Sequence, residues 1–78
     1  AKYDQAIQLL EELRKRRGDD PPTLAYLARA YEGSGALPKA VAILLALGDA
    51  SLSQRMLPDA IEAFEEAVRL QPQDADLR

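Results

Sequence analysis

Apolar residues recur along this chain at the spacing of one helix face, and the longest apolar run lies in the middle. Ala40 to Leu47 is eight consecutive apolar residues without a glycine, a proline or a charge. A helix that is apolar around most of its circumference is normally buried on several sides. The run is too short to cross a bilayer, which takes about 20 apolar residues. We therefore expect a central core helix on which the other segments pack.

Three further segments carry the same helical periodicity, and turn-forming residues separate them. The first helix is predicted over residues 1–17, the second from its N-cap Asp20 to a break at Gly33-Ser34-Gly35, and the last from Leu57 to Gln71. No segment alternates apolar and polar residues at period two, which is the pattern of a half-buried strand. The predicted fold class is therefore all-α.

Each predicted helix has one apolar face, and these faces define the expected core. The first helix contributes Tyr3, Ala6, Ile7, Leu10 and Leu13, and the second contributes Leu24, Leu27, Ala28 and Tyr31. The central helix contributes Val41, Leu44, Leu45, Gly48 and Leu52, with Ile43 and Leu47 beside them. The last helix contributes Ala60, Ile61, Phe64, Ala67 and Val68.

The chain also aligns with itself. The spacing Tyr3-x-x-Ala6-Ile7-x-x-Leu10 recurs as Leu37-x-x-Ala40-Val41-x-x-Leu44 and again as Leu57-x-x-Ala60-Ile61-x-x-Phe64. From Ala6 to Ala40 is 34 residues, whereas from Ala40 to Ala60 is 20, which is 14 fewer. An internal period of this size is typical of helical repeat proteins.

In this repeat the chain resembles the tetratricopeptide repeat (TPR) family, whose 34-residue unit is a hairpin of two antiparallel helices, A and B. One unit's signature falls on Leu24, Leu27, Ala28, Tyr31, Gly35, Leu37 and Ala40, and another's falls on Leu47, Gly48, Ala60, Phe64, Ala67 and Pro72. The resemblance implies a solenoid fragment of about four helices in a single domain, 1–78. Residues 1–18 would form a B-type helix, and 21–47 and 46–74 would form two repeats.

Three residues depart from the family pattern. Ser51 occupies a position where an aromatic residue is expected, Arg55 replaces the glycine of a turn, and Gly18 stands where a proline is expected. Elsewhere the small residues of the pattern, such as Ala28 and Gly48, are expected to let neighbouring helices approach closely.

The 14-residue deficit near Leu45 and Ala46 has two explanations. In the first, the B helix of one repeat and the A helix of the next have merged into one helix from Pro38 to Gln54, since no stop signal precedes Gly48. The last helix would then point away from the first two and expose apolar surface that a second copy could cover. In the second, a loop is missing at this point of the numbering, which a Cα–Cα separation of about 3.8 Å would exclude. We favour the merged helix.

Composition removes most catalytic chemistry. The 78 residues include no cysteine and no histidine, so thiolates, the commonest metal ligand and the commonest general base are absent. The acids show no calcium-loop spacing. With a net charge of −3 and no basic stripe, the chain does not fit nucleic-acid binding. We predict a non-enzyme with no cofactor, metal or membrane insertion. The lack of cysteine fits a reducing compartment, and we identify no targeting sequence.

The resemblance implies that the chain recognises other proteins, because A helices of the family line a concave groove that holds peptides. Carried onto this chain, the predicted peptide-binding residues are Ala25, Arg29, Glu32, Asp49, Leu52 and Ser53. Two function classes follow. The first is a protein- or peptide-binding scaffold, and the alternative is a structural module that forms a homodimer through its apolar central helix. Sedimentation would separate the two classes.

Overall fold

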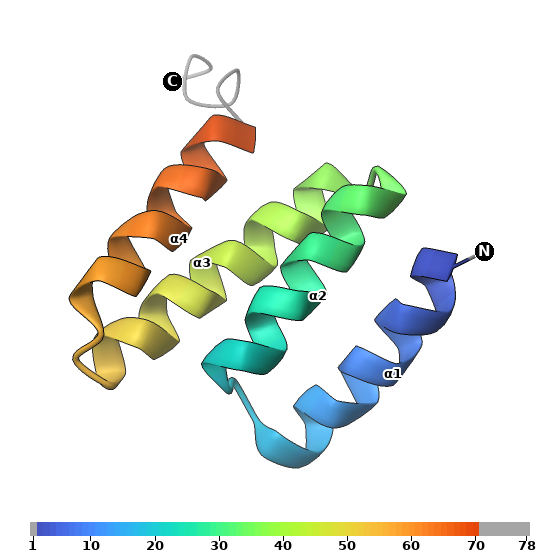
Figure 1. Ribbon diagram of the computed structural model, residues 1–78, viewed down its shortest axis with the longest axis horizontal. Coiled ribbons are helices and arrows are strands. Elements are labelled where there is room, and N and C mark those ends of the chain that lie inside the picture. The colour runs from blue at the N-terminus through green and yellow to red at the C-terminus, as the bar shows by residue number, and fades with distance from the viewer. Residues whose placement is uncertain (1, 71–78) are drawn as a thin grey trace.

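The computed structural model describes residues 2–70, which form four α-helices (Figure 1). These are α1 (Lys2–Arg17), α2 (Pro21–Ser34), α3 (Leu37–Ser53) and α4 (Leu57–Leu70). Every predicted helix is present and the described part of the chain has no strand, so the all-α prediction is confirmed. The predicted end of the last helix at Gln71 lies outside the described residues.

The helices pack in chain order as successive antiparallel hairpins. Within the described residues, α1 contacts α2, α2 contacts α3 and α3 contacts α4, with no contact between helices further apart in the sequence. Figure 1 accordingly shows α1 and α4 at opposite edges and α3 between α2 and α4. Such an array is stabilised mainly by contacts between neighbouring elements. None of the helices in residues 2–70 has the length and hydropathy needed to cross a membrane.

The start of α2 follows the local signals in the sequence. The Asp20 carboxylate accepts hydrogen bonds from the Thr23 backbone N–H at 3.3 Å and from the Thr23 hydroxyl at 3.0 Å, which satisfies donors that a helix start leaves unpaired. Pro21 and Pro22 occupy the first turn, where a missing N–H costs nothing. The prediction of Asp20 as the N-cap is therefore confirmed.

The three turns share one backbone feature, a residue with positive φ. Gly18 and Gly35 supply it before and after α2, with φ of 79° and 87°. In the turn between α3 and α4, Arg55 adopts φ of 63°. A side chain is unfavourable in this left-handed region, which glycine enters freely. Because Arg55 stands where the family pattern has a glycine, the backbone of this turn is strained.

The central segment forms one continuous helix, as the merged-helix explanation requires. α3 passes through Leu45 and Ala46 without a break and ends at Ser53, one residue before the predicted end. Its C-cap Gln54 donates its backbone N–H to the carbonyl of Ala50 at 3.2 Å. Gly48 does not stop the helix. It lies at the crossing with α4, where an added Cβ would come within 2.5 Å of the Phe64 ring, so the predicted close approach at this glycine is confirmed.

The core is centred on α2 and α3. Every residue predicted for the buried face of α2 is buried, and Ala40 of α3 and Ala60 of α4 are almost completely inaccessible. The buried cluster is Leu24, Leu27, Ala28, Tyr31, Ala40, Val41, Ile43, Leu44 and Ala67. α1 has no fully buried residue, because only α2 covers it, and Tyr3 of its predicted face is 45% exposed.

Four residues of α3 and α4 were wrongly predicted to be buried in the core. Ile61 and Val68 of α4 are 55% and 65% exposed, and Leu45 and Leu52 of α3 are about half exposed. α4 instead buries its three alanines, Ala60, Ala63 and Ala67, against α3. The periodicity marks every position that is apolar, whereas burial also requires a neighbouring element on that side. No helix of the described chain covers the flank of α4 that carries Leu57, Ile61 and Val68.

A hydrogen bond between side chains ties α1 to α2. The Tyr31 hydroxyl donates to a carboxylate oxygen of Glu11. This bond, followed by burial and then by the negative charge of Glu11, raises the pKa of Tyr31 from 10.0 to about 12. The Lys39 ammonium lies 5.9 Å from the centre of the Tyr31 ring, within range of a cation–π contact.

The Tyr31 phenol is expected to titrate well above the ordinary pKa of a tyrosine, 10.0. Since its pKa in the folded chain lies above its ordinary value, the stability it contributes is present below pH 10 and is lost as the pH rises towards 12. Absorbance titration of a Tyr3→Phe/Tyr26→Phe variant isolates Tyr31, and we expect a midpoint near 12. Adding Glu11→Gln should move that midpoint back towards 10. A Tyr31 midpoint near 10 in the Tyr3→Phe/Tyr26→Phe variant would show that the Tyr31–Glu11 hydrogen bond does not form in solution.

Candidate protein-binding groove

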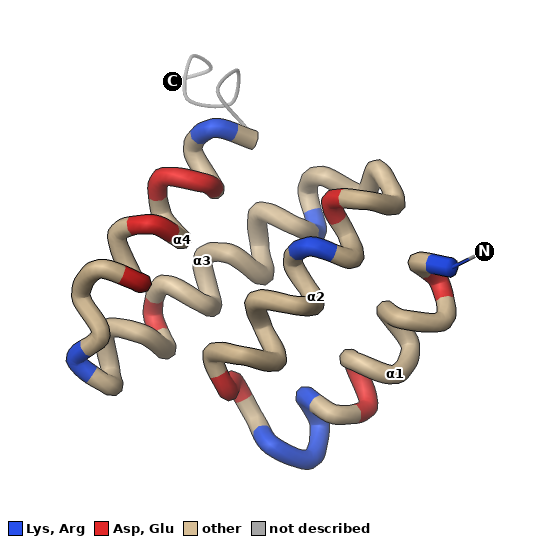
Figure 2. The backbone as a smooth tube through the Cα atoms, in the orientation of Figure 1, with Lys and Arg blue, Asp and Glu red and all other residues tan. Residues whose placement is uncertain are grey.

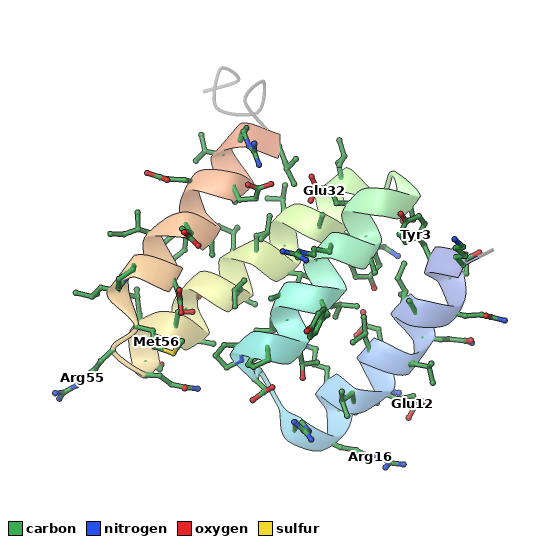
Figure 3. All side chains as sticks on the ribbon, in the orientation of Figure 1. Tyr3, Glu12, Arg16, Glu32, Arg55 and Met56 are labelled. Carbon is green, nitrogen blue, oxygen red and sulfur yellow. The ribbon has the colours of Figure 1, made fainter. Side chains whose placement is uncertain are left out.

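An open groove of about 830 Å³ lies between α2 and α4, with α3 as its floor. Glu32, near the C-terminal end of α2, and Met56, in the turn between α3 and α4, lie at its two ends (Figure 3). The lining residues are Pro21, Pro22, Ala25, Ala28, Arg29 and Glu32 from α2, Leu44, Leu47 and Ser51 from α3, Met56 from the turn, and Asp59, Glu62, Ala63, Glu65, Glu66 and Arg69 from α4.

Helical spacing explains why these side chains share the groove. On α2, the lining residues Ala25, Arg29 and Glu32 are separated by four and three positions, so they follow one face. On α4, Asp59, Glu62 and Glu66 are separated by three and four positions, so they also follow one face. Because α2 and α4 both pack on α3 without touching each other, these two faces remain open and become the walls of the groove.

The floor and the walls differ in chemistry. The floor is largely apolar, with the buried Leu44 and the partly buried Leu47 of α3 among its lining residues. The walls carry charges, and Figure 2 shows acidic segments recurring along α4. Near the C-terminal end of α4, the guanidinium of Arg69 donates to the carboxylate of Glu66, one turn earlier, and forms an ion pair with it. The groove therefore combines an apolar base with charged, solvent-accessible edges.

Ser51 is the polar exception in the floor. It is completely buried, and its hydroxyl has no hydrogen-bond partner within the described residues. Most buried polar side chains in proteins do have a partner, and a serine inside a helix commonly finds one in the carbonyl four residues earlier. Ser51 is among the residues that line the groove, so its unsatisfied hydroxyl lies next to the space that a ligand would occupy.

The structure brings together only half of the residues predicted to bind peptide. Ala25, Arg29 and Glu32 all line the groove. Asp49 and Ser53 instead line a second, smaller hollow of about 310 Å³ beside Asp19 of the loop before α2.

Leu52, the sixth predicted residue, is half exposed and lines neither hollow. The reason is the direction of side chains on α3. Residues two positions apart on a helix point about 200° apart, so Ser53 points away from the groove that Ser51 lines. Once α3 is a single helix, its second half cannot present the same face as a separate A helix would.

The acidic wall of α4 is the part of the groove that sequence reasoning missed. Glu62 and Glu65 are exposed and Glu66 is partly buried, and all three line the groove. The signal that could have identified it is the position of Ala63, a small buried residue within three positions of each of these acids along the sequence. In residues 2–70, no three acidic side chains converge closely enough to hold a metal ion.

Comparison with known protein families gives two matches, both to models of the tetratricopeptide repeat. One covers residues 1–56 and the other residues 41–74. They overlap over 41–56, so most of α3 is matched twice, once at the end of one match and once at the start of the next. No curated protein and no solved structure matches the chain significantly.

Proposed function

Because the chain belongs to the tetratricopeptide repeat family, whose repeats are generally protein–protein interaction modules, we propose that the groove between α2 and α4 binds a segment of a partner protein. The observation that supports this most directly is the apolar floor of Leu44 and Leu47 between two charged walls. Peptide recognition commonly uses a groove that takes apolar side chains at its base and polar groups at its rim.

Family membership also suggests how the helices correspond to repeats. We propose that α1 is a B-type helix, that residues 21–47 form one repeat and that 46–74 form the next, partly beyond the described residues. α3 then serves as helix B for α2 and as helix A for α4. This double role supports the proposal for the groove, because it places α2 and α4 on the same helix with an open space between them.

A groove-filling variant tests the proposed function. Peptides selected from a random display library against the immobilised chain provide the probes, and NMR chemical shifts locate their binding. Ala25, in the α2 wall, is replaced by phenylalanine, and Ala42→Phe is the matched control because Ala42 is exposed on α3 outside both hollows. We expect Ala25→Phe to weaken binding about tenfold or more and Ala42→Phe to leave it unchanged. Peptides that shift only residues outside the groove would refute the proposal.

A second candidate function is self-association, which the exposed apolar residues of α3 and α4 favour. Leu57, Ile61 and Val68 follow one face of α4 without a covering helix, and apolar surface of this kind often marks an interface. Sedimentation of the peptide-free chain over a dilution series distinguishes this function from the first. A dimer that resists dilution and is lost in Ile61→Lys would support self-association, whereas a monomer would leave the groove as the functional surface.

A further inference from the structure

The groove contains the entire excess of negative charge of this chain. Its lining includes five carboxylates, those of Glu32, Asp59, Glu62, Glu65 and Glu66, and two guanidiniums, those of Arg29 and Arg69. This leaves a formal charge of −3, which equals the net charge of all 78 residues. The remaining eight acids and eight bases of the sequence therefore balance.

The few bases of the groove do not offset its acidic wall evenly. Arg69 is held by Glu66 of the same helix, so its charge is already compensated within α4. Arg29 lies on the opposite wall, on α2. The strongest basic run, residues 14–17, lies at the end of α1, away from α4 (Figure 2). Glu62 and Glu65, both exposed, thus face the groove in a local excess of negative charge.

A second, independent feature indicates that the groove is built to hold a ligand. The buried Ser51 hydroxyl in its floor has no partner within the described residues. A segment that laid an N–H group against the floor would provide that partner. Leu44 and Leu47 beside Ser51 offer contact to apolar side chains, which a small hydrophilic cation would not use.

We propose that the partner segment is a basic one, with lysine or arginine side chains towards the α4 wall and apolar side chains on the floor. This inference rests on the proposed function of the groove and specifies its ligand. Complementary charge across an interface selects partners and accelerates association. The negative charge of the α4 wall repels phosphate backbones and acidic peptides, so the groove selects ligands by the sign of their charge.

A set of probe peptides that differ only in charge tests the proposal. All probes share the same leucine and alanine positions and differ only in having lysine, glutamine or glutamate at the others. We expect the lysine peptide to bind in the groove, the glutamine peptide to bind more weakly and the glutamate peptide not to bind. Affinity for the lysine peptide should fall as sodium chloride rises from about 0.05 to 0.5 M, because salt screens exposed charges.

Neutralising the wall provides the matched variants. Glu62→Gln and Glu65→Gln should each weaken the lysine peptide about two- to fivefold, the effect of one exposed ion pair. Glu12→Gln is the control, since Glu12 is exposed and points away from the other helices (Figure 3). Thermal melts confirm folding, and Glu62→Gln should not lower stability because it relieves repulsion from Glu66 one turn away.

The possible outcomes separate this inference from the function on which it rests. If the lysine and glutamate peptides perturb the groove residues with equal affinity, the groove binds peptides but the charge inference is wrong. If no probe peptide and no library-selected peptide perturbs the groove, both proposals fall. If free spermine displaces the lysine peptide at equal concentration, the occupant is a small polycation and the assignment of a polypeptide ligand is overturned.

Discussion

Replacing Gly48 by valine is expected to destabilise the fold by about 3 kcal/mol. Gly48 is buried in the middle of α3, and a Cβ built there would lie 2.5 Å from two carbons of the Phe64 ring. Contacts this short force a ring held between α3 and α4 to move. Valine gains slightly in helix propensity over glycine, but this gain is smaller than the cost of separating two packed helices.

Gly33→Val is the matched control for that experiment. Gly33 also lies inside a helix, and its added Cβ would meet the end of the Tyr3 side chain. Tyr3, however, is nearly half exposed on α1 (Figure 3) and can swing into solvent. We expect a change within about 1 kcal/mol for this variant. Urea denaturation followed by circular dichroism measures both free energies of unfolding.

A smaller side chain at position 64 should recover part of the stability that Gly48→Val loses. Phe64→Leu removes the ring that the valine would strike, so Gly48→Val/Phe64→Leu should be less destabilised than the sum of the two single variants. Additive effects would mean that the cost at Gly48 arises elsewhere, and the close approach of α3 and α4 at this point would have to be abandoned.

Local signals in the sequence were sufficient to place the helices. Asp20 caps α2 as its carboxyl group and the following prolines predict, and the absence of a stop signal before Gly48 correctly indicated one long α3. These features depend on residues within one or two turns of each other, so the order of residues alone determines them. The spacing of Ala40 and Ala60 likewise identified positions that are buried.

Features that depend on distant elements were harder to predict. The Tyr31–Glu11 hydrogen bond joins residues 20 positions apart, on two different helices. Ile61 was wrongly predicted to be buried for a related reason, and Asp49 lies beside the second hollow rather than the groove. Whether an apolar residue is covered, or a polar one faces a groove, depends on which neighbouring helix lies beside it. The merged α3 changed those neighbours relative to a regular array of repeats.

Leu27→Ala is expected to destabilise the fold strongly, by about 2–5 kcal/mol. Leu27 is 0% exposed and belongs to the cluster that joins α2 to α3. Removing its side chain loses the transfer free energy of the buried carbons and leaves a cavity that rigid helices fill only partly. A chain of this size has a total stability of about 4–12 kcal/mol, so the variant gives up a large part of it.

The same substitution at an exposed position isolates the effect of burial. Leu9 lies on α1 and is 71% exposed, so Leu9→Ala should change the free energy of unfolding by no more than about 0.5 kcal/mol. Calorimetry should show the midpoint of Leu27→Ala lowered by at least about 8 °C, given roughly 4–8 °C for each kcal/mol in a domain this small. Because α2 is the only helix that contacts α1 in the described chain, amide exchange in Leu27→Ala should accelerate in α1 as well as in α2. Protection retained in α1 would show that it does not depend on α2, contrary to an array held together by neighbouring contacts.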